Sequence, residues 1–259
     1  MKKFIAIAAA FVMTLSGPAA GFAATSAQDI ITNKRIYYTQ NHSGGAMTYQ
    51  TARVKVSKKT GKKEYLRVDI VFPNMKGYST VIKEFNEANK NEFRDMSDNF
   101  VKEYAKEAQK YMSDVKFVSS KAEAPYSLKV EYSMKYNKEN VISVLYTITT
   151  TVAGASHTEY KSCNYDFVTG KDIVPDQVSL IPTAGETMEL ALKSFNSKTK
   201  NKKIYKDVEI TEDDVQFYFE KQAVTFYVQP GFMADESLGI VTYRLTDDSA
   251  REYLRKKEK

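Results

Sequence analysis

Apolar and polar side chains alternate strictly along several stretches of this sequence, and a chain with that pattern is typical of strands that bury one face only. In residues 66–72 every second side chain is apolar, with Arg67 and Asp69 between them. Residues 52–56 repeat the pattern, and the intervening Lys58–Lys62 is basic and contains a glycine, as hairpin tips often do. The alternation therefore predicts antiparallel strands joined by hairpins.

Further strands follow the same reasoning. The clearest alternation covers residues 126–136, and residues 141–152 form a β-branched run that fits a sheet. Another strand is predicted over residues 160–168. The apolar positions change parity between Tyr160 and Cys163, which predicts a bulge in that strand.

Three local details accompany these strands. Pro73 is expected to end the strand that contains residues 66–72, because proline cannot donate to a hydrogen-bond ladder. An initial strand is predicted within residues 29–38. The glycine-rich residues 41–45 predict a turn, which would expose His42 to solvent.

Between these predicted strands, apolar residues no longer recur at every second position. They recur instead at every third or fourth position. Residues 79–112 carry Phe, Met and Tyr at that spacing, bridged by Asn89, with charged residues on the other side. The pattern predicts a long amphipathic helix, continuous or broken once. Its aromatic stripe could form a ligand groove, but packing against a sheet is the preferred interpretation.

The later part of the chain predicts a second unit. Thr183 and Glu186 form a capping box before a helix. Residues 217–219 and 224–228 predict a hairpin around Lys221, and residues 240–245 predict a final strand. The fold class predicted from both units is α+β, with antiparallel sheets each packed with a helix in two linked modules.

The first 23 residues are interpreted as a secretory signal peptide. A basic start precedes an apolar run that ends at Leu15, and small residues follow. Gly21 and Ala23 occupy the two positions that a signal peptidase reads, so cleavage after Ala23 is predicted, with Thr25–Ala27 as a second site. No apolar stretch reaches the ~20 residues that span a bilayer. We expect an extracytoplasmic protein, secreted or periplasmic, without a transmembrane segment.

Net charge narrows the choice of partners. The chain has 38 Lys and Arg against 32 Asp and Glu, and loss of Lys2 and Lys3 with the signal peptide lowers the charge from +6 to +4. A mildly basic extracytoplasmic protein suits an envelope protein, a cell-wall polymer or a membrane surface. Nucleic acid is not expected, because the aromatic residues mostly occupy the apolar positions of the predicted strands and helix.

Cysteine and histidine are too scarce for several kinds of site. The single Cys163 excludes an internal disulfide, and we expect it to be a buried, unreactive thiol. His42 and His157 are the only histidines, and neither lies in a metal-binding spacing. The sequence therefore predicts no metal site and no cofactor.

His157 is the one candidate catalytic residue. A histidine base would need a nucleophile and an orienting carboxylate, and Ser156 and Glu159 are near it in sequence. Adjacency in sequence does not make a triad, so the preferred interpretation is a turn histidine that bonds backbone groups.

The irregular segment Gln229–Gly239 is the candidate recognition loop. It follows a predicted strand, and its proline and glycines set its backbone. Apolar residues on an anchored loop are typical of binding anchors, although the same residues could instead cap the core. The candidate binding residues are Pro230, Gly231, Phe232, Met233, Asp235 and Glu236.

Several motifs, in order along residues 46–245, resemble a bacterial envelope family that links two modules called DUF4163 and DUF3298. The motifs are Phe72-Pro73, Phe85-Asn86, Ala153-Gly154-Ala155-Ser156-His157, Asn164-Tyr165-Asp166, Thr169-Gly170-Lys171, Phe217-Tyr218-Phe219 and Phe226-Tyr227-Val228-Gln229-Pro230. One residue more than in the family's Gly-Ala-His turn precedes His157.

The resemblance implies a division of the chain and an extracytoplasmic setting. The implied parts are the signal peptide at 1–23, an N-terminal segment at 24–45, a DUF4163-like α+β module at 46–168, a DUF3298-like α+β module at 169–246 and a charged tail at 247–259. Relatives with these modules include lysozyme-sensing anti-sigma factors and some peptidoglycan deacetylases. Neither an anti-sigma segment nor a deacetylase domain is recognised in this sequence.

Two functions are compatible with these features. The favoured one is a non-catalytic binding module that recognises a protein or a cell-envelope component, and the alternative is an envelope hydrolase using His157 with a serine or a carboxylate. A lysozyme-like partner is possible but disfavoured, because lysozymes are usually basic and the mature chain carries +4. Asp235 and Glu236 would have to supply a local acidic patch.

Overall fold

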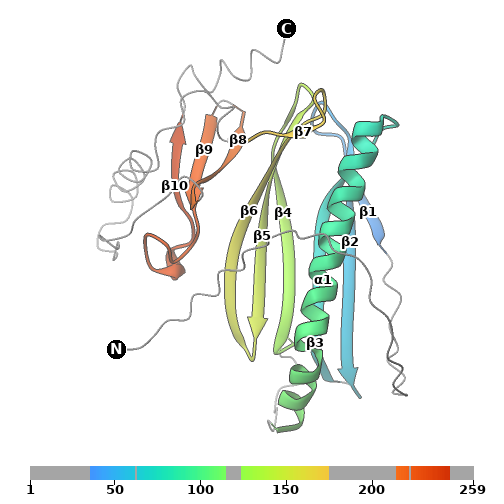
Figure 1. Cartoon of the computed structure of the whole chain (residues 1–259), viewed down its shortest axis with the longest axis vertical. Coiled ribbons are helices and arrows are strands. Elements are labelled where there is room, and N and C mark those ends of the chain that lie inside the picture. The colour runs from blue at the N-terminus through green and yellow to red at the C-terminus, as the bar shows by residue number, and fades with distance from the viewer. Residues whose placement is uncertain (1–35, 62, 115–123, 175–213, 222, 246–259) are drawn as a thin grey trace, which may run out of the picture. The chain divides into compact units, whose positions relative to one another are not determined.

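In a computed structural model, residues 36–61, 63–114, 124–174, 214–221 and 223–245 are described. They form two sheets and one long helix (Figure 1). The larger sheet has the order β1-β2-β3-β4-β5-β6-β7, and the smaller sheet has the order β10-β9-β8. The elements are β1 (Tyr37–His42), β2 (Tyr49–Thr60), β3 (Lys63–Met75), α1 (Thr80–Asp114), β4 (Tyr126–Lys138), β5 (Val141–Val152), β6 (Ala155–Asp166), β7 (Lys171–Asp172), β8 (Gln216–Glu220), β9 (Ala223–Val228) and β10 (Val241–Leu245).

The predicted α+β class is confirmed. The β2–β3, β4–β5 and β8–β9 hairpins lie where the alternation placed them, and β10 pairs with β9 as the final strand. One pair in the larger sheet, β3 with β4, is parallel. A parallel pair needs a long crossover, and α1 lies in that connection. The helix predicted after Thr183 lies outside the described residues, and the division into two modules stays a prediction.

The long helix is continuous over 35 residues. Ser79 caps its start, because the Ser79 hydroxyl accepts a hydrogen bond from the Ile82 N–H at 3.2 Å. Gly77 precedes the cap with φ +154, and a Cβ there would lie 2.4 Å from Cδ1 of Ile82. Side chains are rarely found at this φ, so the backbone conformation favours glycine at this position.

One face of the helix packs on the larger sheet, as the aromatic stripe predicted. Phe93 stacks on Phe72 of β3 at 4.9 Å and lies 5.1 Å from Tyr146 of β5, between ring centroids. Asn86 docks on the end of β3, accepting from the Met75 N–H at 2.8 Å and donating to its carbonyl oxygen at 2.9 Å. The stripe is therefore core and not a ligand groove.

The prediction that Pro73 ends its strand is wrong, because β3 continues to Met75 and Pro73 pairs with Thr51. Proline has no N–H to donate. Pairing with β4 covers only Leu66–Ile70, so Pro73 lies where β3 has no ladder to maintain on that side. This position tolerates a proline for the same reason that an edge strand does.

The predicted bulge in β6 is also wrong, because β6 pairs with β5 without interruption from Ala155 to Asp166. Its apolar residues change parity because both faces are covered. Cys163 packs with the core under α1, whereas Tyr160 packs with Leu145, Tyr218 and Tyr227 toward the smaller sheet. A strand with partly buried apolar residues on both faces loses the simple alternation that a one-sided strand shows.

A buried polar network joins the two sheets. Asn164 of β6 accepts from the Ser143 hydroxyl at 2.6 Å and donates to the Phe217 carbonyl at 2.8 Å. The Phe219 N–H of β8 donates to the Ser143 oxygen at 2.9 Å. Both side chains are buried, and the network satisfies two backbone groups of β8. It therefore fixes β8 against β5 and β6.

The prediction for His42 is wrong as well. The strand described here is β1, Tyr37–His42, and His42 is its last residue; residues 29–35 of the predicted initial strand lie outside the described residues. Its ring stacks on Tyr49 with centroids 4.6 Å apart, and its Nε2 lies 3.0 Å from the Thr51 hydroxyl. Side-chain partners on β2 thus hold a residue that the local sequence alone assigns to a turn.

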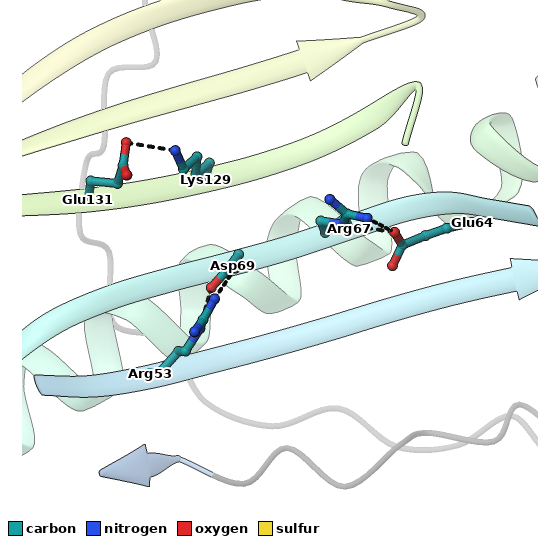
Figure 2. A network of polar contacts seen from close by, with 6 residues as sticks. All are labelled: Arg53, Glu64, Arg67, Asp69, Lys129 and Glu131. Carbon is teal, nitrogen blue, oxygen red and sulfur yellow. Dashed lines mark hydrogen bonds and ion pairs between the residues drawn. The ribbon is translucent and has the colours of Figure 1, made fainter. Parts of the chain in front are cut away.

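Away from the helix, β2, β3 and β4 carry paired charges (Figure 2). Arg53 pairs with Asp69, Arg67 with Glu64, and Lys129 with Glu131. For Glu64, burial opposes ionisation, but hydrogen bonds from Arg67 and Ser57 hold the pKa of its carboxyl below the usual value. The charges on this part of the sheet compensate one another.

Candidate functional site

The candidate loop, Gln229–Gly239, is fastened to the outer edge of β6. The Gln229 side chain accepts from the Tyr160 N–H at 2.9 Å and donates to the Tyr160 carbonyl at 2.5 Å. Tyr160 pairs with Thr147 of β5 on one side, but β7 pairs with β6 only at Tyr165 and Asp166, so no strand of that sheet lies along the other side of Tyr160. The amide therefore takes the place of a strand partner and anchors the loop where it begins.

The middle of the loop is buried. Met233 is 1% exposed, and Ala234 is buried with it in the core of the smaller sheet; Phe232 is partly buried against the same core. The expectation that Met233 is an exposed anchor is wrong, and the alternative that it caps the core holds. A loop that leaves a strand must cover the sheet's open end, and the nearest apolar side chains do so.

The far part of the loop turns outward as a short 3-10 turn, Glu236–Leu238. Asp235 caps it by accepting from the Ser237 N–H at 3.0 Å and from the Ser237 hydroxyl at 2.6 Å. Gly239 closes it at φ 72, a backbone conformation that favours glycine. Two adjacent carboxylates, Asp235 and Glu236, are thus exposed on an ordered turn.

His157 and this loop meet, although they are 79 residues apart. The His157 Nδ1 lies 2.6 Å from the Glu236 Oε1, with the side chains 61% and 51% exposed. His157 lies in β6, paired with Thr150, and the turn before it is Ala153–Gly154. The interpretation of His157 as a turn histidine bonding backbone groups is therefore wrong.

A histidine held by a carboxylate is two thirds of a catalytic triad, but neither Ser156 nor Ser237 completes it. Ser156 bonds the Thr151 hydroxyl at 2.9 Å and, as the residue immediately before His157 in β6, faces the other side of the sheet. The Ser237 hydroxyl is engaged by Asp235. Both members of the pair are open to solvent, whereas catalytic groups usually work in a water-excluding cleft. The arrangement suits contact with a partner better than nucleophilic chemistry.

Cys163 does not supply a nucleophile either. Burial raises the pKa of its thiol to about 12, and Asp172 adds to the effect. We expect labelling by iodoacetamide at pH 8 to be at least about tenfold slower in the native protein than in urea, because thiolate is scarce in the native thiol. Equal rates would show that the thiol is open and ionisable.

The described ranges contain neither a cluster of side chains suited to a metal ion nor a helix suited to span a membrane. Within them, no group of three or more His, Cys, Asp or Glu side chains is placed to hold a metal ion. No helix in those ranges is both long enough and apolar enough to cross a bilayer. The predicted signal peptide (residues 1–23) and the residues 247–259 lie outside them.

Sequence reasoning missed two features that build the site. Gln229 gave no sign of its partner on β6, although it lies in the Val228-Gln229-Pro230 motif. Asn164 lies in the Asn164-Tyr165-Asp166 motif, but the sequence suggested no role for its side chain. In the structure this side chain donates to the Phe217 carbonyl of β8. Polar residues between apolar strand positions were the available signal, because a buried amide needs partners.

The sequence was compared with protein-family models and with curated proteins, and the structure with solved structures. Residues 59–157 match the family model described as "Deacetylase PdaC", a segment that runs from the end of β2 to His157. None of the curated proteins matches the sequence.

Two solved structures are similar over most of the chain. A DUF3298 family member from Bacteroides fragilis shares 17% identity with a TM-score of 0.52, covering 78% of this chain and 91% of that one. A DUF3298 family protein from Pseudomonas aeruginosa shares 14% identity with a TM-score of 0.46, covering 79% and 92%. The similarity to the Bacteroides fragilis structure shows a shared fold, while the pairing with a DUF4163 module stays a prediction. The chain is thus similar in fold to a DUF3298 protein and, over residues 59–157, in sequence to the PdaC family model.

Proposed function

We propose that this protein is an extracytoplasmic, non-catalytic binding module that recognises a protein or a cell-wall polymer through the loop Gln229–Gly239. One observation carries the proposal: the loop is anchored at Gln229 and Met233, yet exposes Asp235 and Glu236, with Glu236 joined to His157. Fixed ends lower the entropy that a loop loses on binding, so an ordered, exposed tip favours recognition. Candidate contact residues are therefore Asp235, Glu236 and His157, with Gly231 and Phe232 beside them.

Charge indicates the kind of group that the tip would contact. Two neighbouring carboxylates favour a partner with basic groups at the contact point. The mature chain would carry +4, which opposes long-range steering of a basic protein such as a lysozyme. A partner with a local basic patch and little overall positive charge fits both features.

The proposal is tested by capture from an envelope extract with two matched variants. The loop variant Asp235→Asn with Glu236→Gln removes the acidic tip. The control Lys129→Gln with Glu131→Gln neutralises another exposed pair, whose side chains are 56% and 58% exposed (Figure 2). We expect a component retained by wild type and control to be lost from the loop variant, as measured by quantitative mass spectrometry. Equal capture by all three proteins would refute this role for the loop.

Replacing His157 with alanine separates a binding role from a structural one. The pair with Glu236 is exposed, and exposed ion pairs contribute only about 0–1 kcal/mol. We therefore expect the free energy of unfolding to change by less than about 1 kcal/mol, while capture of the envelope component falls. Urea unfolding of wild type and variant measures the first quantity. Loss of a hydrolytic activity of the wild type on envelope polymers would instead support the hydrolase alternative.

Export is the second part of the proposal, and the apolar segment that ends at Leu15 supports it. We expect protein recovered from the envelope fraction to begin at Ala24, as intact mass would show. Full-length chain confined to the cytoplasm would contradict an extracytoplasmic role.

A further inference from the structure

Large apolar side chains are exposed at few places in the described part of the chain. Two of them, Tyr37 and Tyr38, lie on β1, and the others are Tyr78, Val168 and Val174. Tyr78 is 95% exposed and Val168 is 68% exposed. Single exposed apolar residues are ordinary, but an apolar side chain that a fixed turn holds in water is a candidate contact residue.

The turn that carries Tyr78 is held on both sides. The Lys76 N–H donates to the Thr48 carbonyl at 2.9 Å, and Ser79 caps α1. Gly77 leaves no room for a side chain beside Ile82. Tyr78 therefore extends into water from a well-fixed backbone, and its exposure is not the result of a loose loop.

The turn that carries Val168 is held equally well. Asp166 accepts from the Val168 N–H at 2.9 Å and from the Thr169 hydroxyl at 3.0 Å. The Gly170 N–H donates to the Asp166 carbonyl at 2.8 Å. These bonds keep Val168 at the outer point of the turn.

The two turns lie at the same end of the larger sheet. A Cβ placed on Gly170 would lie 3.5 Å from the methyl groups of Val81, in the first turn of α1. One helical turn further on, the ring of Phe85 packs against the rings of Tyr165 and Phe167. The distances between ring centroids are 4.8 and 5.2 Å. The start of α1 and β7 are also seen at one end of the sheet in Figure 1.

Basic side chains border both apolar residues. Lys76 precedes Tyr78 by two positions, Lys171 follows Val168 by three, and both lysines are exposed. The neighbouring acid Asp172 is attracted electrostatically by Lys161 and repelled by Glu92 of α1. The nearby Lys138 is paired with Glu139.

We infer that this end of the larger sheet, formed by Lys76, Tyr78, Val168 and Lys171, is a docking surface for an anionic lipid bilayer. Tyrosine favours the headgroup region of a membrane, and a small apolar side chain beside it can enter the acyl boundary. Lysines next to them attract anionic headgroups. Lipid fits better than a protein groove, because the apolar residues project from two turns and do not line a concave surface.

The inference depends on the proposed function only for access to a membrane surface. The loop Gln229–Gly239 contributes no residue to this end of the sheet, so the two surfaces can be tested separately. A wild-type protein that captures the envelope component but does not bind vesicles would overturn this inference alone. The opposite result would overturn the recognition loop alone.

The test is co-sedimentation of the protein with phosphatidylglycerol vesicles and with phosphatidylcholine vesicles. We expect binding to the anionic vesicles that weakens with added salt. Tyr78→Ser with Val168→Ser should lower the partition coefficient about tenfold, and Lys76→Gln or Lys171→Gln about fivefold each. The control Tyr37→Ser with Tyr38→Ser, which removes two exposed tyrosines elsewhere, should bind as wild type does.

All variants keep the same N-terminus, so any binding by the apolar segment that ends at Leu15 is common to them. Equal sedimentation of wild type and the Tyr78/Val168 variant would overturn the inference, as would equal binding to both kinds of vesicle. Absence of vesicle binding, with an envelope protein captured by wild type but not by the Tyr78/Val168 variant, would assign this surface to a protein. Thermal unfolding of each variant checks that the fold is retained.

Discussion

Replacing Asn164 with alanine is expected to lower the free energy of unfolding by about 3 kcal/mol, because it orphans buried polar groups. The amide accepts from Ser143 and donates to the Phe217 carbonyl, and neither partner can reach water in its place. The loss of both bonds also removes the side chain that holds β8 against β6. The free energy follows from urea unfolding monitored by circular dichroism.

Asn41→Ala serves as the matched control, because Asn41 lies exposed on β1. We expect it to change the free energy of unfolding by less than about 0.5 kcal/mol. A loss below about 1 kcal/mol for Asn164→Ala would mean that the attachment of the smaller sheet does not depend on this network.

The second large effect is expected for Phe93→Ala, at about 3–5 kcal/mol of unfolding free energy. Phe93 is fully buried between α1 and the larger sheet and contacts Phe72 and Tyr146 through its ring. Truncation leaves a cavity that a helix and a sheet cannot close without moving apart. The same denaturation experiment measures the loss.

Tyr78→Ala is the control for this substitution, because it removes an aromatic ring that is almost wholly exposed. A Phe93→Ala variant as stable as Tyr78→Ala would contradict the packing of the helix stripe on the sheet.

The alternation in the sequence was sufficient to predict the hairpins and the helix, because each depends on neighbours close in sequence. β2 and β3 show one buried face each, so their period of two is plain. The period of α1 was equally plain, because one face packs on the sheet and the other meets water.

Two of the errors, those for β6 and for Met233, arose where segments distant in sequence decide which side chains are buried. Tyr160 and Cys163 suggested a bulge because a second sheet, far along the chain, covers the other face of β6. Met233 could have been exposed or buried until the position of β9 and β10 was known. Local sequence does not encode which tertiary neighbour a residue meets.

In the candidate site, too, the sequence identified individual residues but not the contacts between them. Both His157 and Glu236 were singled out by their residue types, yet for separate roles. Their contact depends on Gln229, which fastens the loop to β6 through the backbone of Tyr160. A side-chain amide that binds backbone groups 69 residues away leaves no periodic signal in the sequence.

The central claim is that the tip of the Gln229–Gly239 loop contacts the partner, and site-specific photo-crosslinking in living cells tests it most directly. A photoreactive amino acid placed at Asp235 should yield a discrete crosslinked adduct in the envelope fraction. The same amino acid at Lys129, on the charged face of the larger sheet, should yield none (Figure 2). Adducts from Lys129 with none from Asp235 would contradict the claim and place the recognition surface on the sheet.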